Sequence, residues 1–144
     1  SKISAMDVSD KALRIAKKNA VLNKVDINFI HQDILKTNNL DKFYDVIVSN
    51  PPYGRELEKK EMKNNVLNNE PHLALFVDNK NPLLFYNKIA ELAKNFLTKN
   101  GQLHIEINQY LGKETVILLA EKGFKNIQLK KDIFGNDRII SAFK

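Results

Sequence analysis

Tyr44-Asp45-Val46-Ile47-Val48-Ser49-Asn50-Pro51-Pro52-Tyr53 joins an apolar run to a corner made by two prolines. The run is rich in β-branched residues, which is typical of a buried strand. Each proline has a fixed φ angle and no N–H to donate, so we expect the strand to end at Ser49. The corner presents the Asn50 amide, backbone carbonyls and an aromatic ring. Ligands bind at the carboxyl ends of strands in open α/β sheets, so the corner is either a binding site or only a strand-ending turn.

Length and composition place the chain among globular proteins. Its 144 residues suit one domain, with 43% hydrophobic and 28% charged residues. Cysteine is absent, which excludes disulfides and thiolate metal sites. We find no long apolar run and no signal-peptide pattern, and therefore expect a cytoplasmic protein without a membrane partner. The net charge of +6 comes from scattered lysines, which favours a solvated surface, although nucleic acid is not excluded as a partner.

Apolar runs and alternations predict six strands and three helices. The expected strands are Lys2–Met6, Asp26–His31, Tyr44–Ser49, Gln102–Ile107, Lys125–Lys131 and Arg138–Phe143. Helices are expected after the first strand, before the fourth strand, and over Gly112–Lys122. This order predicts an α/β fold with a mostly parallel sheet and an antiparallel last pair of strands.

Capping residues set the expected helix boundaries. Ser9 or Asp10 caps the first helix, which runs to about Leu22, and Asn23 suits a left-handed C-terminal cap. Asn81 is expected to cap the second helix, with Pro82 in its first turn. Asn100-Gly101 is expected to form a turn. The polar stretch Gly54–Lys80 has no clear periodicity and reads as a long loop.

Polar residues follow three consecutive predicted strands, namely Asp7, Asp33 and Asn50. In a doubly wound sheet these positions line one crevice. An acid after one strand can accept hydrogen bonds from ribose hydroxyls, and an acid after the next can accept one from an adenine amine. Each residue alone is a weak signal because Asp commonly ends strands, but the three together with the proline corner are more specific.

Other kinds of site fit the sequence less well. The five glycines are isolated from one another, so there is no glycine-rich loop for a phosphate. His31, His72 and His104 are far apart and lack metal-ligand spacing. No nucleophile-elbow motif is present. The sequence therefore favours a site for a nucleoside-containing ligand over a metal or a nucleophilic triad.

Four motifs resemble those of one methyltransferase family. They are Asp7-Val8-Ser9 with Ala12-Leu13, then Asp45 to Tyr53, then Glu70-Pro71 with Ala74-Leu75-Phe76, and finally Phe134-Gly135-Asn136-Asp137-Arg138. Together they resemble the HemK/PrmC family of class I enzymes, which use S-adenosylmethionine to methylate the glutamine of the Gly-Gly-Gln motif in peptide-chain release factors. The Asn-Pro-Pro-Tyr motif is shared with N-methyltransferases of DNA adenine and ribosomal RNA guanine, which remain the alternative.

The resemblance implies a Rossmann-like three-layer sandwich and a set of site residues. The catalytic corner would be Asn50, Pro51, Pro52 and Tyr53, with Glu70 among the residues that bind substrate together with Asn50, Pro51 and Tyr53. The residues at the cofactor would be Asp7, Val8, Asp33, Ile34 and Asn50. The cofactor would be S-adenosylmethionine, with S-adenosylhomocysteine as product and no metal. The implied partner is a release factor.

The sequence also departs from that family. The first strand with its glycine-rich loop, and the helical domain that precedes it, are absent, so residues 1–144 read as a single truncated catalytic domain. The absent strand belongs between the strands that end at Asp7 and Ser49. We expect those two edges to pair directly, or a second copy to fill the gap as a homodimer or by strand exchange. We expect the 144 residues to be inactive alone and to bind S-adenosylmethionine poorly, which leaves a cofactor-free interaction module as a further alternative.

Overall fold

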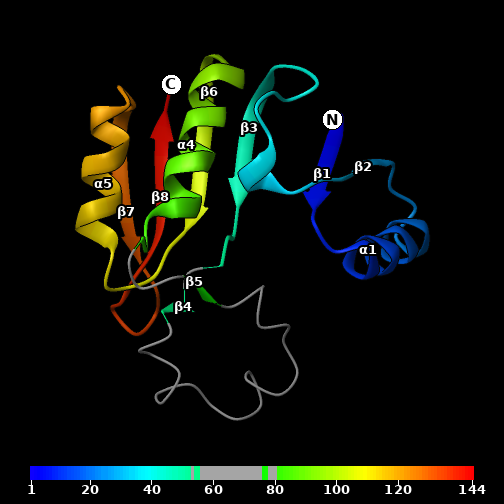
Figure 1. The fold of residues 1–144 in the computed structure, drawn as a ribbon, viewed down its shortest axis with the longest axis horizontal. Coiled ribbons are helices and arrows are strands. Elements are labelled where there is room, and N and C mark those ends of the chain that lie inside the picture. The colour runs from blue at the N-terminus through cyan, green and yellow to red at the C-terminus, as the bar shows by residue number, and fades with distance from the viewer. Residues whose placement is uncertain (53, 56–75, 78–80) are drawn as a thin grey trace. The chain divides into compact units, whose positions relative to one another are not determined.

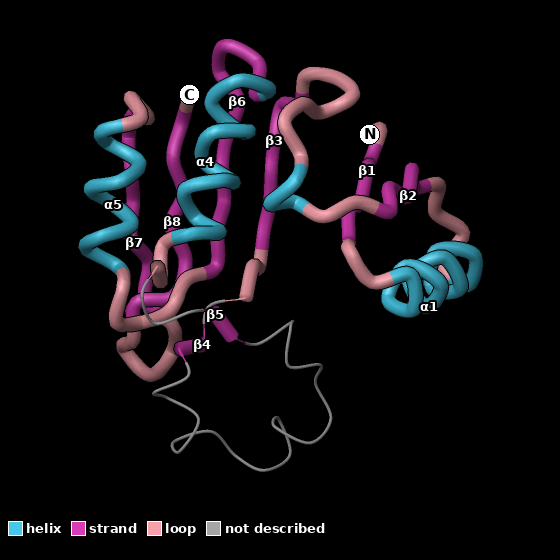
Figure 2. The backbone as a smooth tube through the Cα atoms, in the orientation of Figure 1, coloured by secondary structure: helices cyan, strands magenta, loops and turns pink. Residues whose placement is uncertain are grey.

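The computed structural model describes residues 1–52, 54–55, 76–77 and 81–144 (Figures 1 and 2). The chain forms two compact units, Ser1–Asn38 and Asn39–Lys144. In the described ranges, no helix has the length and apolar character needed to cross a membrane. The prediction that residues 1–144 form one catalytic domain stays a prediction.

The first unit is a strand–helix–strand arrangement. It contains β1 (Ile3–Asp7), α1 (Asp10–Leu22), β2 (Ile27–His31) and the short 3-10 helix η1 (Ile34–Lys36). The two strands are parallel, with Ile3 opposite Ile27 and Asp7 opposite His31. Leu13 and Ala20, seven residues apart on α1, are its buried positions, as the helical period requires.

The ends of α1 match the expected caps at one end only. Ser9 is the N-cap, and its hydroxyl accepts a hydrogen bond from the Ala12 N–H at 3.2 Å. The prediction of a left-handed Asn23 is wrong, because its φ is −88° and the next residue, Lys24, has a φ of 53°. Asn23 donates both its N–H and its side-chain amide to the Asn19 carbonyl, so it closes the last turn while still near helical geometry.

The second unit is a sheet covered by two helices on one face (Figure 1). Its strands are ordered β3-β6-β8-β7, where β3 and β6 are parallel and β8 is antiparallel to both of its neighbours. The elements are β3 (Tyr44–Ser49), α4 (Leu84–Phe96), β6 (Leu97–Glu106), α5 (Gly112–Glu121), β7 (Lys125–Lys131) and β8 (Asp137–Phe143). The antiparallel final pair is therefore confirmed. Two short strands, β4 (Gly54–Arg55) and β5 (Phe76–Val77), pair in parallel with each other.

The helix-covered face of the sheet is the core of this unit. Leu103 and Ile105 of β6 lie opposite Ala142 and Ile140 of β8, and all four are at most 1% exposed. Residues of α4 complete the core, namely Tyr86, Ile89, Ala90, Leu92 and Ala93. Apolar side chains on the other face of the sheet are exposed, and Val48, for example, is 74% exposed.

One expected boundary is wrong in this unit, and a second lies at an irregularity in β6. Asn81 does not cap α4 with its side chain, because the helix begins two residues after Pro82 and the Asn81 carbonyl accepts from the Leu84 N–H in a preceding turn. Asn100-Gly101 lies inside the bounds of β6, but the pairing with β3 shifts here from Tyr44–Leu97 to Val46–Gln102, so residues 98–101 bulge out of the ladder and the expected turn is not contradicted. Gly101 is buried against Leu97, and a Cβ there would lie 2.9 Å from the Leu97 Cβ, so close packing also favours glycine at this position.

The edges of β1 and β3 were expected either to pair with each other or to take a strand from another copy. Among the described strands, β1 pairs with β2 and β3 pairs with β6, and the two pairs belong to separate sheets. Because these strands belong to different compact units, direct pairing of the edges that end at Asp7 and Ser49 and a strand supplied by another copy both stay predictions.

Candidate active site

The carboxyl ends of three strands meet at one edge of the second unit's sheet. β3 and β6 are parallel, and β7 has the same direction as β6 because β8 is antiparallel to both. The segments that follow these strands therefore share an edge (Figure 1), namely the corner at Asn50, the segment 107–110, and the hairpin 132–136. This is the edge at which open α/β sheets bind ligands.

The Asn50 corner combines an exposed amide with a buried support. Asn50 directly follows β3 and is exposed, Pro51 is buried, and Pro52 is half-buried. A buried proline with a fixed φ holds the backbone, and neither proline competes for nearby acceptors because neither has an N–H. The corner can therefore present the Asn50 side-chain oxygen and main-chain carbonyls to a donor such as an amide NH₂ group. Tyr53 lies outside the described residues.

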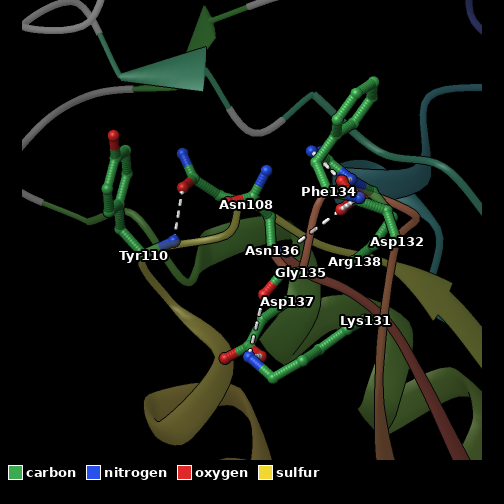
Figure 3. A network of polar contacts seen from close by, with 9 residues as sticks. All are labelled: Asn108, Tyr110, Lys131, Asp132, Phe134, Gly135, Asn136, Asp137 and Arg138. Atoms are coloured by element: carbon green, nitrogen blue, oxygen red, sulfur yellow. Dashed lines mark hydrogen bonds and ion pairs between the residues drawn. The ribbon is translucent and has the colours of Figure 1, made fainter.

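A buried tyrosine fixes the segment that follows β6. The Tyr86 hydroxyl, on α4, accepts a hydrogen bond from the Asn108 N–H at 3.0 Å, and the two residues are 1% and 3% exposed. The Asn108 side chain in turn accepts from the Tyr110 N–H at 2.9 Å (Figure 3). Sequence reasoning missed Tyr86. The available signal was its place on an apolar helix face, where a buried tyrosine hydroxyl needs a partner.

The hairpin between β7 and β8 is organised by Asp132 (Figure 3). Its Oδ1 accepts from the N–H groups of Phe134 and Asn136 at 2.9 and 3.0 Å, and its Oδ2 lies 3.2 Å from the Arg138 guanidinium. The pKa of the Asp132 carboxyl is lowered, mainly by the Asn136 N–H and further by Phe134 and Arg138, against an opposing effect of burial. Gly135 allows the tight turn because its φ is +84°.

A second polar cluster braces the base of the same hairpin. Lys131 donates at 3.0 Å both to the Gly135 carbonyl and to the Asp137 carboxylate. A pocket of about 230 Å³ lies between this cluster and the segment after β6, and it is lined by Gln109, Tyr110, Lys131, Gly135, Asn136 and Asp137. The hairpin is therefore held to a defined shape by side chains at both its tip and its base.

The first unit places the predicted cofactor residues at the ends of two adjacent parallel strands. Asp7 ends β1, and its Oδ1 accepts from the Ser9 N–H at 2.7 Å. Val8 follows, and its carbonyl lies 2.9 Å from Nε2 of His31. Asp33 caps η1 through a hydrogen bond of 3.0 Å from the Leu35 N–H to its Oδ1. Both carboxylates are thus oriented by backbone donors at the same edge of the β1–β2 sheet.

The predicted site residues divide between the two units. Asp7, Val8, Asp33 and Ile34 lie in the first unit, and Asn50, Pro51 and Pro52 lie in the second. The crevice that would join them stays a prediction, as do the roles assigned to each residue. Glu70 falls, like Tyr53, outside the described ranges.

Comparison with known proteins identifies the family. Residues 1–74, just over half of the chain, match the family described as "Methyltransferase small domain". The chain belongs to the methyltransferase small domain family. One relative, the release factor glutamine methyltransferase of Flavobacterium psychrophilum, is 64% identical over 140 residues, which are 97% of this chain and 49% of the relative. The resemblance drawn from the motifs is thereby confirmed, and the chain spans about half the length of the curated relatives it matches.

Solved methyltransferases share the fold. A methyltransferase from Pyrococcus furiosus has a TM-score of 0.71 at 19% identity, covering 99% of this chain and 62% of its own. The 16S rRNA N2 G1207 methyltransferase of Thermus thermophilus, solved with AdoMet and guanosine, has a TM-score of 0.65 at 18% identity, covering 100% of this chain and 32% of its own. The prediction of a Rossmann-like methyltransferase fold is confirmed.

Proposed function

We propose that the protein transfers a methyl group from S-adenosylmethionine to the side-chain amide nitrogen of glutamine in the Gly-Gly-Gln motif of peptide-chain release factors. The relative that is 64% identical is named a release factor glutamine methyltransferase. The observation that carries the proposal is the Asn50 corner. The exposed Asn50 amide directly follows β3, and the next residue, Pro51, is buried. It is suited to a planar NH₂ group, because it offers acceptors and no competing N–H from either proline.

The corner's own groups would hold the substrate amide. The Asn50 side-chain oxygen and the Pro51 carbonyl would each accept one N–H of the substrate amide, which fixes the direction of the nitrogen lone pair. Such positioning can lower a barrier by several kcal/mol, up to about 7–11 in well-oriented systems. The acceptors also favour the positive charge that develops on the nitrogen, and they do so without reorganising at the moment of reaction. Tyr53 would pack against the amide plane.

The residues of the first unit fit the proposed cofactor. Two carboxylates follow adjacent parallel strands, and each is held through Oδ1 by a backbone N–H, from Ser9 at Asp7 and from Leu35 at Asp33. Carboxylates are acceptors, as the ribose hydroxyls and the adenine amine of a nucleoside require. Asp7 would bind the ribose, with Val8 beside it, and Asp33 with Ile34 would bind the adenine. S-adenosylmethionine would supply an electrophilic methyl group: its carbon–sulfur bond would break as the nitrogen–carbon bond forms, S-adenosylhomocysteine would leave, and the methylated nitrogen would release one proton.

The test is a methylation assay with the protein encoded by its complete gene. Radiolabelled S-adenosylmethionine is offered with a release factor, with the same factor carrying asparagine in place of the Gly-Gly-Gln glutamine, and with ribosomal RNA and DNA. We expect label on the glutamine-containing factor alone, and mass spectrometry to place one methyl group on that side chain. Label on nucleic acid with none on the factor would contradict the proposal and favour the alternative amino-methyltransferases.

A further inference from the structure

The tip of the β7–β8 hairpin exposes two large apolar side chains next to each other. Ile133 is 93% exposed and Phe134 is 82% exposed. Figure 3 shows the Phe134 ring extending away from Asp132 and Asn136. Single exposed apolar residues are common, but two adjacent ones on a loop tip are a concentrated apolar surface of the kind found at binding sites.

The loop that carries these side chains is pre-organised. Asp132 accepts from the backbone on both sides of the tip, at Phe134 and at Asn136, and also contacts the Arg138 guanidinium. The base is closed by Lys131, which bridges to Asp137. A loop already held in one shape loses little conformational entropy on binding, so the apolar tip can contribute most of its transfer free energy to affinity.

The hairpin tip lies at the same edge of the sheet as the Asn50 corner. The hairpin follows β7, the Asn50 corner follows β3, and the two strands run in the same direction in one sheet. A macromolecule presenting a side chain to Asn50 would therefore extend along the edge that carries Ile133 and Phe134. A free amino acid or a short peptide would be too small to use both places.

We propose that Ile133 and Phe134 form a docking tip that binds an apolar depression on the folded protein substrate, away from the methylated glutamine. This inference rests on the proposed function and names a specificity contact for it. The shared sheet edge favours the protein substrate over other occupants. A second copy of this chain and a lipid surface are the competing occupants, and the experiment separates them.

The experiment compares the wild-type protein, encoded by its complete gene, with the double variant Ile133→Ser/Phe134→Ser. The control is Ile117→Ser, which removes a 57% exposed isoleucine from α5. Affinity for an intact release factor is measured by titration calorimetry, and kcat/KM is measured with that factor and with a short Gly-Gly-Gln peptide. Circular dichroism and denaturant unfolding check that all three proteins are folded.

We expect the double variant to bind the intact factor at least about tenfold more weakly, since burying one such side chain is worth about that factor or more. Its kcat/KM with the peptide, and all values for Ile117→Ser, should stay within about twofold of wild type. Unchanged affinity for the intact factor would overturn the docking tip while leaving the proposed function standing. An equal loss with the peptide would overturn it as well, as would a change in oligomeric state by sedimentation or in binding to phospholipid vesicles. A wild-type protein that methylates neither substrate would overturn the proposed function and this inference together.

Discussion

Tyr86→Phe should destabilise the second unit because it removes the hydroxyl that accepts the Asn108 N–H. The ring stays, so the packing of α4 on the sheet changes little, but the Asn108 N–H loses the hydroxyl that accepts from it at 3.0 Å. Both residues are almost fully buried, at 1% and 3% exposure, so water does not readily replace the acceptor. A buried donor left without its acceptor costs about 1–3 kcal/mol, and we expect a loss of unfolding free energy in that range.

The assay is denaturant unfolding followed by fluorescence or circular dichroism, with the slope of the transition checked for constancy. The matched control is Tyr110→Phe, which removes a hydroxyl from a side chain that is 53% exposed, where water can replace any hydrogen bond that the hydroxyl makes. The control should change the unfolding free energy by less than about 0.5 kcal/mol. A loss below about 0.5 kcal/mol in Tyr86→Phe, or equal losses in both variants, would refute the claim that this buried bond holds the segment after β6.

Three further predictions concern the core, the hairpin and the cofactor residues. Leu103→Ala should cost about 2–5 kcal/mol of unfolding free energy, because Leu103 is fully buried in the central strand, and a loss below about 1 kcal/mol would contradict that placement. The lowered pKa of Asp132 means that its carboxylate stabilises the hairpin above the ordinary aspartate pKa of about 4 and ceases to do so as the pH falls through the lower folded value. The amide NMR signals of Phe134 and Asn136 should therefore stay constant from neutral pH to about pH 5 and move only below about pH 4, and a midpoint above that value would argue against the assigned hydrogen bonds. Asp7→Asn should raise the KM for S-adenosylmethionine about tenfold, as expected for a lost charged acceptor, with little change in stability, and an unchanged KM would remove Asp7 from the cofactor site.

Sequence patterns predicted the elements whose bounds depend on neighbouring residues alone. β3 and β7 have the expected bounds, because one is a β-branched run stopped by prolines and the other alternates cleanly. Ser9 caps α1 as expected, since an N-cap acts within three residues of chain. The Asn81 cap was wrong because a separate turn precedes α4, and nothing in the residues around Pro82 distinguishes that turn from the first turn of a helix.

The site itself was predictable only where its residues adjoin strand ends. Asn50 lies beside its strand in the sequence, so its position at the carboxyl edge could be inferred from the apolar run and the prolines. Tyr86 and Asn108 are 22 residues apart, and nothing local links a helix hydroxyl to the end of a strand. The hydrogen bonds that Asp132 accepts in the β7–β8 hairpin were missed for another reason. Asp132 was not among the candidate residues, although an aspartate at the start of a turn is suited to accept hydrogen bonds from the N–H groups that follow.

The substrate clamp at Asn50 is tested most directly by single-turnover methylation of a Gly-Gly-Gln release factor with Asn50→Ala. Asn50 is exposed, so the variant should fold with nearly wild-type stability. We expect the methyl-transfer rate at saturating S-adenosylmethionine to be at least about a hundredfold lower, the usual cost of removing one oriented group that stabilises a transition state. A rate within a few-fold of wild type would contradict the clamp.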